Sequence, residues 1–446
     1  MAGTKQNQFL AQFLNDYGMI IVLLALTIVL SVATLDQQQA VGRVAGAEVA
    51  EKVNRRSDSL ILLVAVPKGI LDYEFTNEFE SKVDTRHEVF EYVHGGPREA
   101  KQALNRAKAA NRPIDLIVCT TASSKWDPVR DSEKEIVQPS SYVWPDLLMP
   151  DNVVTIAQRI TIIAIIAIGM TMVIITAGID LSVGSLIALS AVVTGVLIRD
   201  VFGGEDATTP TLVLAALGGI LASGLVGLGT GFLVAGFRLP PFIVTLAMML
   251  LVRGVANVIS DQKTIHEIPN QFEVLGKGYL LGIPYSVMLM FGLYLIAYLI
   301  MSRTVLGRQI YAVGGNEEAA RLSGVPVKRV QLIVYTVCGL LAGLGGVILC
   351  SQLGSAKASF GQMDELTVIA AVVVGGTSLM GGQGKILGTL IGAFIIGVIQ
   401  NGMNTLGLDD KTQMIVLGSV IVLAVLLDRI KKGQVKWTDV RGVLNS

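Results

Sequence analysis

Hydrophobic and polar positions divide the chain into long apolar runs separated by polar, glycine or proline boundaries. A helix needs about 20 apolar residues to cross a bilayer, and several runs reach this length. The pattern predicts ten spans, at residues 18–35, 153–177, 182–199, 211–235, 241–259, 283–301, 330–350, 365–381, 386–402 and 412–428. The fold class expected from this pattern is an all-α polytopic membrane protein.

One long polar segment, residues 36–152, interrupts the series of apolar runs and holds about half of the chain's charged residues. Residues 59–66 and 114–119 read as buried strands, and residues 97–111 read as an amphipathic helix that begins near a proline. Strand, helix and strand in this order predict a small α/β insert between the first and second spans.

The expected domains follow from this division. They are an N-terminal tail with the first span (1–35), the insert (36–152), a core with nine spans (153–430) and a C-terminal tail (431–446). The first apolar run also resembles a signal peptide, with Ser31-Val32-Ala33 or Ala45-Gly46-Ala47 as cleavage site. Lys5 is balanced by Asp16 in its leading region and no basic cluster is present, which favours an uncleaved span.

The distribution of lysine and arginine predicts the orientation of the spans. Short loops rich in these residues face the cytoplasm. With both termini inside, the inner segments hold more basic residues than the outer short loops, chiefly because of Arg303, Arg308, Arg321, Lys328 and Arg329. We therefore expect both termini and residues 302–330 in the cytoplasm and the insert outside.

The composition of the chain indicates how its helices pack and argues against disulfide and metal sites. The chain is 52% hydrophobic and contains 48 glycines, and small residues allow close helix contact in lipid. Its three cysteines are far apart, so neither a disulfide framework nor a metal site is expected. The net charge is zero, and we expect no cofactor and no nucleic-acid partner. Two glycine series are candidates for helix contact: Gly224-x-x-Gly227-x-Gly229-x-Gly231 and Gly339-x-x-x-Gly343-x-Gly345-Gly346.

The polar segment 302–330 contains more structure than a connection between two spans needs. After a break at Gly314 and Gly315, residues 316–321 have good helix propensity, and Gly324 and Pro326 end the helix. Glu317, Glu318 and Arg321 offer polar contacts on this helix, whereas Ala319, Ala320 and Leu322 offer an apolar face. Charges of both signs on a short exposed helix indicate a docking surface for a soluble partner. An amphipathic helix lying on the lipid surface is the alternative.

The glycine-rich stretch 375–385 does not meet the requirements of a phosphate-binding loop. Leu379 stands where the first glycine of that motif belongs, and Ile386 stands where it needs serine or threonine. The glycines more simply make a tight turn between two spans. We therefore expect no catalytic residue and no ATP hydrolysis by this chain itself.

Polar groups inside the predicted spans are candidates for a translocation path. Asp180 and Ser182 are good N-cap residues for the span that follows them, and a carboxylate near membrane depth is alternatively a gate or path residue. Arg253 lies toward the outer end of its span, where it either reaches the lipid headgroups or lines a water-filled path.

Three sequence motifs resemble the permease subunits of ribose-type ABC sugar importers, members of a monosaccharide and branched-chain amino acid permease superfamily. They are GIDLSVGS at 178–185, LGRQIYAVGGNEEAARLSGVPVKRV at 306–330 and LTVIAAVVVGGTSLMGGQG at 366–384. The resemblance covers roughly residues 150–430 and the first span. The insert departs from the short connection usual in that family.

The resemblance implies a multi-pass subunit of the bacterial inner membrane that moves a ribose-like pentose or a hexose by alternating access. It implies three partners: a periplasmic sugar-binding protein, a cytoplasmic ATPase with two nucleotide-binding cassettes, and a second permease copy or paralogue. It also implies that residues 314–327 form the coupling helix seated on the ATPase. The expected contact residues are Gly315, Asn316, Glu317, Glu318, Ala319, Ala320, Arg321, Ser323 and Gly324.

An importer of this kind needs groups that hydrogen-bond sugar hydroxyls. Gln400, Asn401 and Asn404 cluster near the outer end of their span, and amides suit this role. Hydrogen bonds between helices are an equally ordinary use for them.

Several other functions stay open from the sequence. A permease for branched-chain amino acids, nucleosides or a signalling sugar belongs to the same superfamily. An ion-coupled secondary transporter would normally need carboxylates within its spans, which are nearly absent here. A sensor would need an output domain, for which the short cytoplasmic segments leave little room.

Overall fold

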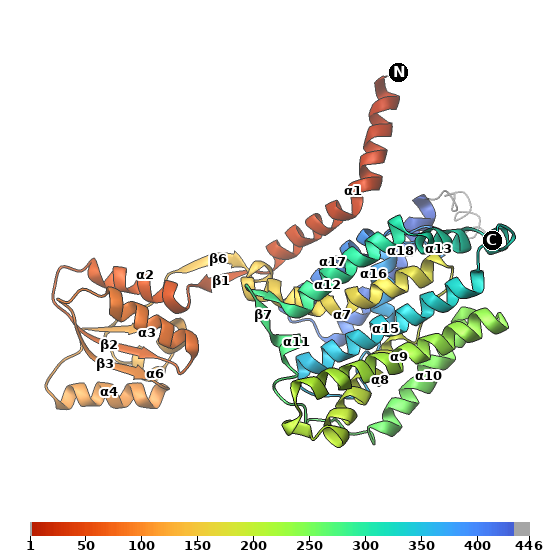
Figure 1. The fold of residues 1–446 in the computed structure, drawn as a ribbon. Coiled ribbons are helices and arrows are strands. Elements are labelled where there is room, and N and C mark those ends of the chain that lie inside the picture. The colour runs from red at the N-terminus through yellow and green to blue at the C-terminus, as the bar shows by residue number, and fades with distance from the viewer. Residues whose placement is uncertain (1, 432–446) are drawn as a thin grey trace. The chain divides into compact units, whose positions relative to one another are not determined.

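The computed structural model describes residues 2–431, so the predicted tail at 431–446 lies almost wholly outside the described residues. The chain forms two compact units, one of residues 1–34 and 146–446 and one of residues 35–145. We call them the membrane unit and the insert unit (Figure 1). Residues 146–152, which the sequence analysis gave to the insert, belong to the membrane unit, where the Asp146 amide donates to the Thr34 carbonyl at 2.9 Å.

The insert unit is built around a parallel sheet. Its sheet order is β3-β2-β4-β5, all parallel, and a separate antiparallel pair joins β1 to β6. Leu62, Val64 and Val66 of β2 pack on one face with Phe75 and Phe79, and Leu63 and Ala65 pack on the other face, because successive side chains of a strand alternate. The elements are β1 (Leu35–Gln39), α2 (Gly42–Asn54), β2 (Ile61–Val66), α3 (Ile70–Lys82), β3 (Glu88–His94), α4 (Pro97–Ala109), β4 (Leu116–Cys119), α5 (Thr121–Ser124), α6 (Asp127–Arg130), β5 (Glu135–Val137) and β6 (Ser141–Pro145).

The membrane unit consists almost entirely of helices. They are α1 (Ala2–Ala33), α7 (Pro150–Ile175), α8 (Val183–Val196), α9 (Thr209–Phe237), α10 (Pro241–Ile259), α11 (Val274–Lys277), α12 (Tyr285–Arg303), α13 (Val305–Gly315), α14 (Glu317–Leu322), α15 (Val327–Leu353), α16 (Asp364–Val374), α17 (Ile386–Thr405) and α18 (Asp410–Lys431). Shorter elements are η1 (Asp146–Leu148), η2 (Leu197–Val201), η3 (Gly204–Asp206), β7 (Tyr279–Leu280) and β8 (Ile283–Pro284). Of these, η2 is a π-helix that continues α8.

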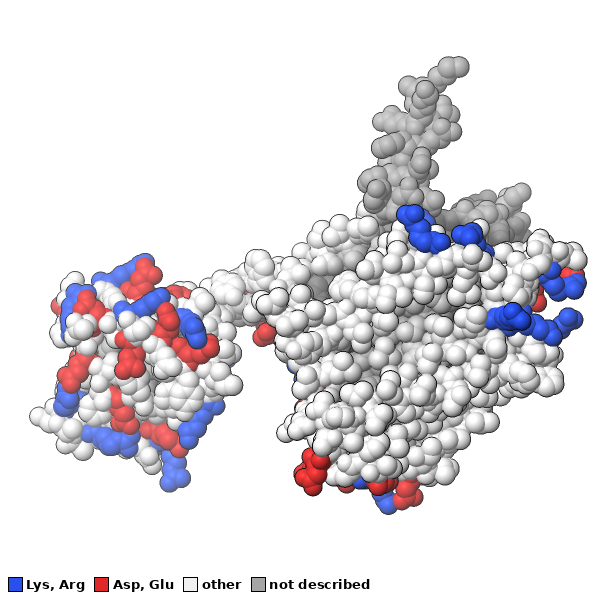
Figure 2. Space-filling model, in the orientation of Figure 1, with Lys and Arg blue, Asp and Glu red and all other residues white. Residues whose placement is uncertain are grey.

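Within residues 2–431, seven helices are long and apolar enough to cross a membrane: α7, α8 with η2, α9, α10, α12, α15 and α17. Each coincides with a predicted span. The predicted spans 18–35 and 412–428 correspond to the shorter apolar stretches Gly18–Ala33 and Lys411–Leu423. Charged side chains lie toward the margins of the visible face of this unit, and a broad area between them is uncharged (Figure 2). Such a belt suits contact with lipid.

The prediction of a full span at 365–381 is wrong. Helix α16 has only 11 residues, or about 16 Å at 1.5 Å per residue, against a hydrocarbon core of about 30 Å. Residues 375–385 leave the helix because Gly376, Gly381 and Gly382 adopt positive φ angles, which glycine reaches at little steric cost. An apolar composition alone did not distinguish this half-length helix from a complete crossing.

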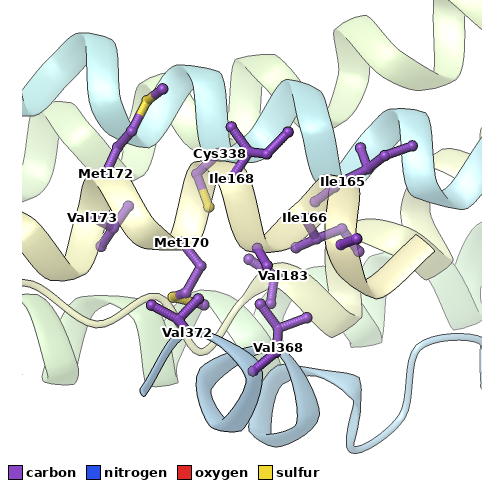
Figure 3. Close-up of a cluster of buried hydrophobic side chains, with 14 of the residues drawn as sticks. Ile165, Ile166, Ile168, Met170, Met172, Val173, Val183, Cys338, Val368 and Val372 are labelled. Atoms are coloured by element: carbon purple, nitrogen blue, oxygen red, sulfur yellow. The ribbon is translucent and has the colours of Figure 1, made fainter. Parts of the chain in front are cut away.

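Helix α15 occupies the centre of the membrane unit, against α7, α8 and α9 (Figure 1). The two predicted glycine series meet here. A Cβ on Gly227 would lie 2.5 Å from the Tyr335 carbonyl oxygen, and a Cβ on Gly339 would lie 3.0 Å from the Gly227 Cα. Backbone therefore packs on backbone where α9 crosses α15. The main core cluster extends from this crossing to α7, α8 and α16 and includes Cys338 (Figure 3).

We expect Gly227→Ala to reduce stability although alanine favours helices. Its methyl group overlaps the α15 backbone, and overpacking of this kind costs about 1–3 kcal/mol. Gly229 is the matched control, because a Cβ there meets nothing within 4 Å, and Gly229→Ala should stabilise the helix by up to about 1 kcal/mol. Thermal unfolding of the full chain in detergent measures both. Equal melting temperatures for the two variants would contradict the close crossing.

Candidate functional site

The polar segment between α12 and α15 folds into two short helices, α13 and α14, with a cap at the start of each. The Thr304 hydroxyl accepts from the Gly307 amide at 3.3 Å, and Asn316 Oδ1 accepts from the Ala319 amide at 2.9 Å. These bonds satisfy amide groups that have no partner within a helix. Gly324 follows α14 at a φ of +82°, and Gly315 ends α13 in an exposed position.

Helix α14 presents a charged surface. Glu317, Glu318 and Arg321 are exposed, and Arg321 Nε donates to Glu318 Oε2 at 3.1 Å while Nη2 contacts Oε1. The Arg321 guanidinium holds the pKa of the Glu318 carboxyl below its usual range. Because an exposed ion pair adds little stability by itself, this pair mainly fixes the direction of two opposite charges at the surface.

The apolar residues of α14 divide between the protein core and the surface. Ala319 and Leu322 are exposed, and Leu322 retains 76% of its accessible area, whereas Ala320 is 5% exposed and packs in the core cluster. The expectation that Ala320 offers itself to a partner is therefore wrong: it anchors α14 to its own chain. Ser323 and Gly324 are exposed beside Leu322.

Helix α13 is tied to the end of α7 and to residues 375–385, which we call the inner link. A Cβ on Gly314 would collide with the Ile175 carbonyl oxygen and lie 2.7 Å from the Gly382 amide nitrogen. Gly382 itself donates to the Ile175 carbonyl at 2.8 Å, and the Tyr311 hydroxyl donates to the Gly384 carbonyl at 2.8 Å. A displacement of α13 must therefore act on both α7 and the inner link.

Asp180 and Ser182 lie in the non-helical residues between α7 and α8 and are both fully buried. Asp180 Oδ1 accepts from the Ser182 amide at 2.9 Å and from its hydroxyl at 2.6 Å. Ser182 occupies the N-cap position of α8, but no side-chain bond caps the helix there. The two residues thus stabilise the bend before α8, and the second oxygen of Asp180 has no partner other than the Cys338 thiol.

Arg253 does not reach toward lipid headgroups. From α10 its Nη1 donates to the carbonyl oxygens of Ala358 and Phe360, each at 2.6 Å. Both acceptors belong to the non-helical residues 354–363 between α15 and α16, and Glu365 and Asp364 at the start of α16 attract the same guanidinium. The carbonyl groups of this non-helical segment need hydrogen-bond donors, and Arg253 supplies one. The sequence did not show that residues 354–363 lie beside Arg253.

The three predicted amide side chains near the end of α17 have different environments. Asn401 is buried and its Oδ1 accepts from the Thr405 hydroxyl at 3.4 Å, whereas Asn404 is exposed and accepts from Gln413 Nε2 at 2.7 Å. Gln400 is half-buried. These bonds hold the turn between α17 and α18. Among the described residues, no hydrogen bond joins this cluster to Asp180, Ser182 or Arg253.

The sequence analysis missed two buried polar residues near the path candidates. Glu365 of α16 is 9% exposed and Tyr335 of α15 is 1% exposed. Each has an oxygen without a hydrogen-bond partner: Glu365 Oε2 and the Tyr335 hydroxyl. Glu365 was taken as the outer boundary of a full span, and one signal could have revealed it: Glu365-Leu-Thr-Val resembles Asp180-Leu-Ser-Val.

Comparisons with known proteins bear on this arrangement. Residues 152–425 match the family model described as branched-chain amino acid transport system / permease component. The chain belongs to this permease family. The match begins after the insert unit, so residues 35–145 stand outside it.

Curated relatives of the permease agree with this assignment. It is 46% identical to the ribose import permease protein RbsC of Escherichia coli strain K12 over 293 residues, which are 65% of this chain and 88% of the relative. It is 44% identical to RbsC of Bacillus subtilis strain 168, covering 64% and 87% of the two chains. The L-arabinose ABC transporter permease protein AraH of Azospirillum brasilense is 39% identical, with 65% and 83% covered. No solved structure matches the chain.

Family membership and the long apolar helices make this permease a multi-pass protein of the inner membrane. A permease subunit is a transport component, not an enzyme. The ion-coupled secondary transporter considered from the sequence is therefore not supported.

The contact of Gly314 with Ile175 predicts that this position tolerates no side chain. We expect Gly314→Ala to push α13 away from α7 and the inner link, with a cost of about 1–3 kcal/mol and a loss of transport. Gly315→Ala is the control, since a Cβ there meets nothing within 4 Å. Thermal unfolding of the permease and transport by the complete reconstituted importer measure both variants. Full transport by Gly314→Ala would show that the close contact is not needed.

Proposed function

We propose that this permease is the membrane-spanning subunit of an ATP-driven importer for a monosaccharide, and that α13 and α14 receive movement from a cytoplasmic ATPase. One observation carries the coupling role. The charged surface of α14 is exposed, while α13 is locked by backbone contacts to α7 and the inner link. A force on the exposed helix would thus reach the transmembrane helices directly.

The relatives support the substrate class. Their names refer to import of ribose, to L-arabinose, to D-allose and to fructose, which are all monosaccharides. We propose a neutral pentose or hexose as the solute. The family description names branched-chain amino acids, so leucine belongs in the same transport assay as a competing candidate.

We further propose the partners and the orientation. A periplasmic sugar-binding protein delivers the solute, an ATPase with two cassettes supplies the energy, and a second copy of the permease completes the path. Both termini, α13 and α14 face the cytoplasm and the insert unit faces outward. The excess of lysine and arginine in the segments assigned to the inside supports this orientation.

Alternating access gives the mechanism we propose. Closure of the cassettes moves α14, and α13 transmits the displacement to Ile175 and the inner link. The end of α7 and the start of α17 then shift relative to α15. The close glycine crossing of α9 and α15 keeps the centre of the unit rigid while these ends move. The path therefore opens to one side of the membrane at a time.

An exchange of the two paired charges tests docking without destroying the helix. The double variant Glu318→Arg with Arg321→Glu keeps an i, i+3 ion pair but reverses the charges offered to the ATPase. We expect sugar transport and sugar-stimulated ATP hydrolysis to fall at least ~10-fold, since a complementary charge contact of about 1.4 kcal/mol corresponds to a factor of ten. The assay uses liposomes that contain the permease, its ATPase and its binding protein.

The matched control is an exposed pair in the loop after α10, where Lys263 Nζ lies 2.6 Å from Asp261 Oδ2. Asp261→Lys with Lys263→Asp should leave coupling unchanged. Unaltered transport by the α14 exchange would refute the docking assignment. Leucine uptake without sugar uptake by the unmodified complex would refute the monosaccharide assignment.

A further inference from the structure

Two helix pairs of the membrane unit are broken by non-helical residues in a similar way. Residues 176–182 separate α7 from α8, and residues 354–363 separate α15 from α16. Helices α7 and α15 are antiparallel: a Cβ on Gly169 would lie 2.6 Å from the Cys338 Cα, and one on Gly345 would lie 3.0 Å from Ile166 Cδ1. The two pairs therefore run through the unit in opposite directions, an arrangement known from transporters with inverted repeats.

The second helix of each pair begins with a related sequence. Asp180-Leu-Ser-Val leads into α8, and Glu365-Leu-Thr-Val stands in the first turns of α16. The corresponding valines, Val183 and Val368, lie in one core cluster (Figure 3). The fold thus brings the two four-residue segments together although 185 positions separate them in the chain.

The second break meets the first turn of α8 at a pair of glycines. A Cβ on Gly184 would contact both Glu365 Oε2 and the Gly361 carbonyl oxygen, and a Cβ on Gly361 would contact the Gly184 carbonyl oxygen. Backbone lies on backbone at this point. The Glu365 carboxylate is therefore held against the first turn of α8, four residues beyond Asp180.

Two buried oxygens in this region, Glu365 Oε2 and the hydroxyl of Tyr335, have no hydrogen-bond partner, and beside Asp180 Oδ2 only the Cys338 thiol, a weak donor, is in reach. Asp180 is 0% exposed, Tyr335 1% and Glu365 9%. The Tyr335 hydroxyl belongs to the same neighbourhood as Asp180, since it would lie 2.5 Å from a Cβ on Gly178. A buried polar group without a partner costs about 1–3 kcal/mol, and more when it is charged, so two unpartnered oxygens beside a weakly bonded carboxylate require an explanation.

We propose that Asp180 and Glu365 are solute-contacting residues of the translocation path. Glu365 offers its unpartnered oxygen to a hydroxyl group of the sugar, and Asp180 offers the oxygen that has only the weak Cys338 thiol as a donor. Tyr335 supplies a further hydrogen bond beside Asp180. Asp180 lies in the first break, and Glu365 follows the second break at the start of α16. This inference rests on the proposed function, because it takes a hydroxyl-rich neutral solute as the cargo.

The chemistry favours a hydroxyl-rich solute over a cation. Arg253 lies near Glu365 and Asp364 and balances one of their two negative charges. Among the described residues, no group of three His, Cys, Asp or Glu side chains gathers as a metal site. Carboxylate oxygens are strong acceptors for hydroxyl donors, and a sugar presents several donors in fixed directions.

The test combines two isosteric variants with monodeoxy analogues of the transported sugar. In liposomes with the full complex, Asp180→Asn and Glu365→Gln should each lower transport by about 10-fold or more, since a hydrogen bond to a charged group contributes about 1.5–3 kcal/mol. Each variant should have one analogue, the one that lacks the hydroxyl contacted by the replaced side chain. The variant should transport this analogue at the same rate as the unmodified permease transports it. Such non-additivity identifies a direct contact.

A purely structural role gives a different result. If Asp180→Asn and Glu365→Gln reduce transport of the sugar and of every analogue by the same factor, the inference is wrong. It is also wrong if both variants transport normally. Asp261→Asn, at an exposed carboxylate, is the control and should change nothing. If the unmodified complex moves no pentose or hexose, the proposed function itself fails and the inference fails with it.

Discussion

The membrane unit depends on one constraint: backbone groups that leave a helix within the packed core must find partners inside the protein. An unsatisfied amide or carbonyl group in hydrocarbon costs several kcal/mol. The break before α8 meets this need through Asp180, which accepts from Ser182, and through the Thr245 hydroxyl, which donates to the Ile179 carbonyl at 3.0 Å. The break before α16 meets it through Arg253. These side chains therefore make two interrupted helices possible.

The interruptions in turn determine where the unit can move. A continuous helix transmits a displacement along its whole length, whereas a broken one can change at the break. At one end of the unit the Ile175 carbonyl oxygen brings three segments together: it ends α7, accepts from Gly382 of the inner link and lies against Gly314 of α13. The exposed α14 follows directly in the chain. The glycine crossing of α9 and α15 provides the rigid reference against which such a shift would act.

Much of this arrangement could be predicted from residues alone. Apolar runs of sufficient length identified the seven long helices. The length and periodicity of such a run can be read without knowing which helices pack against it. The caps and breakers Asn316 and Gly324 delimited α14, because capping is a local effect. The burial of Ala320 could not be predicted. The sequence of one short helix does not show which of its sides packs against the rest of the chain. The half-length of α16 was missed for a similar reason: its glycines allow a continued helix as well as a turn.

The sequence by itself determined the class of the protein, the seven helices that are long and apolar enough to cross a membrane and the position of the polar segment that forms α13 and α14. These features depend on composition, spacing and propensity within about 20 residues, the span of a bilayer. Only the tertiary structure decided that Arg253 serves a non-helical segment and that Glu365 lies against Gly184, the first turn after Asp180. Contacts between positions so far apart in the chain depend on how helices pack, and a single sequence does not show which faces meet.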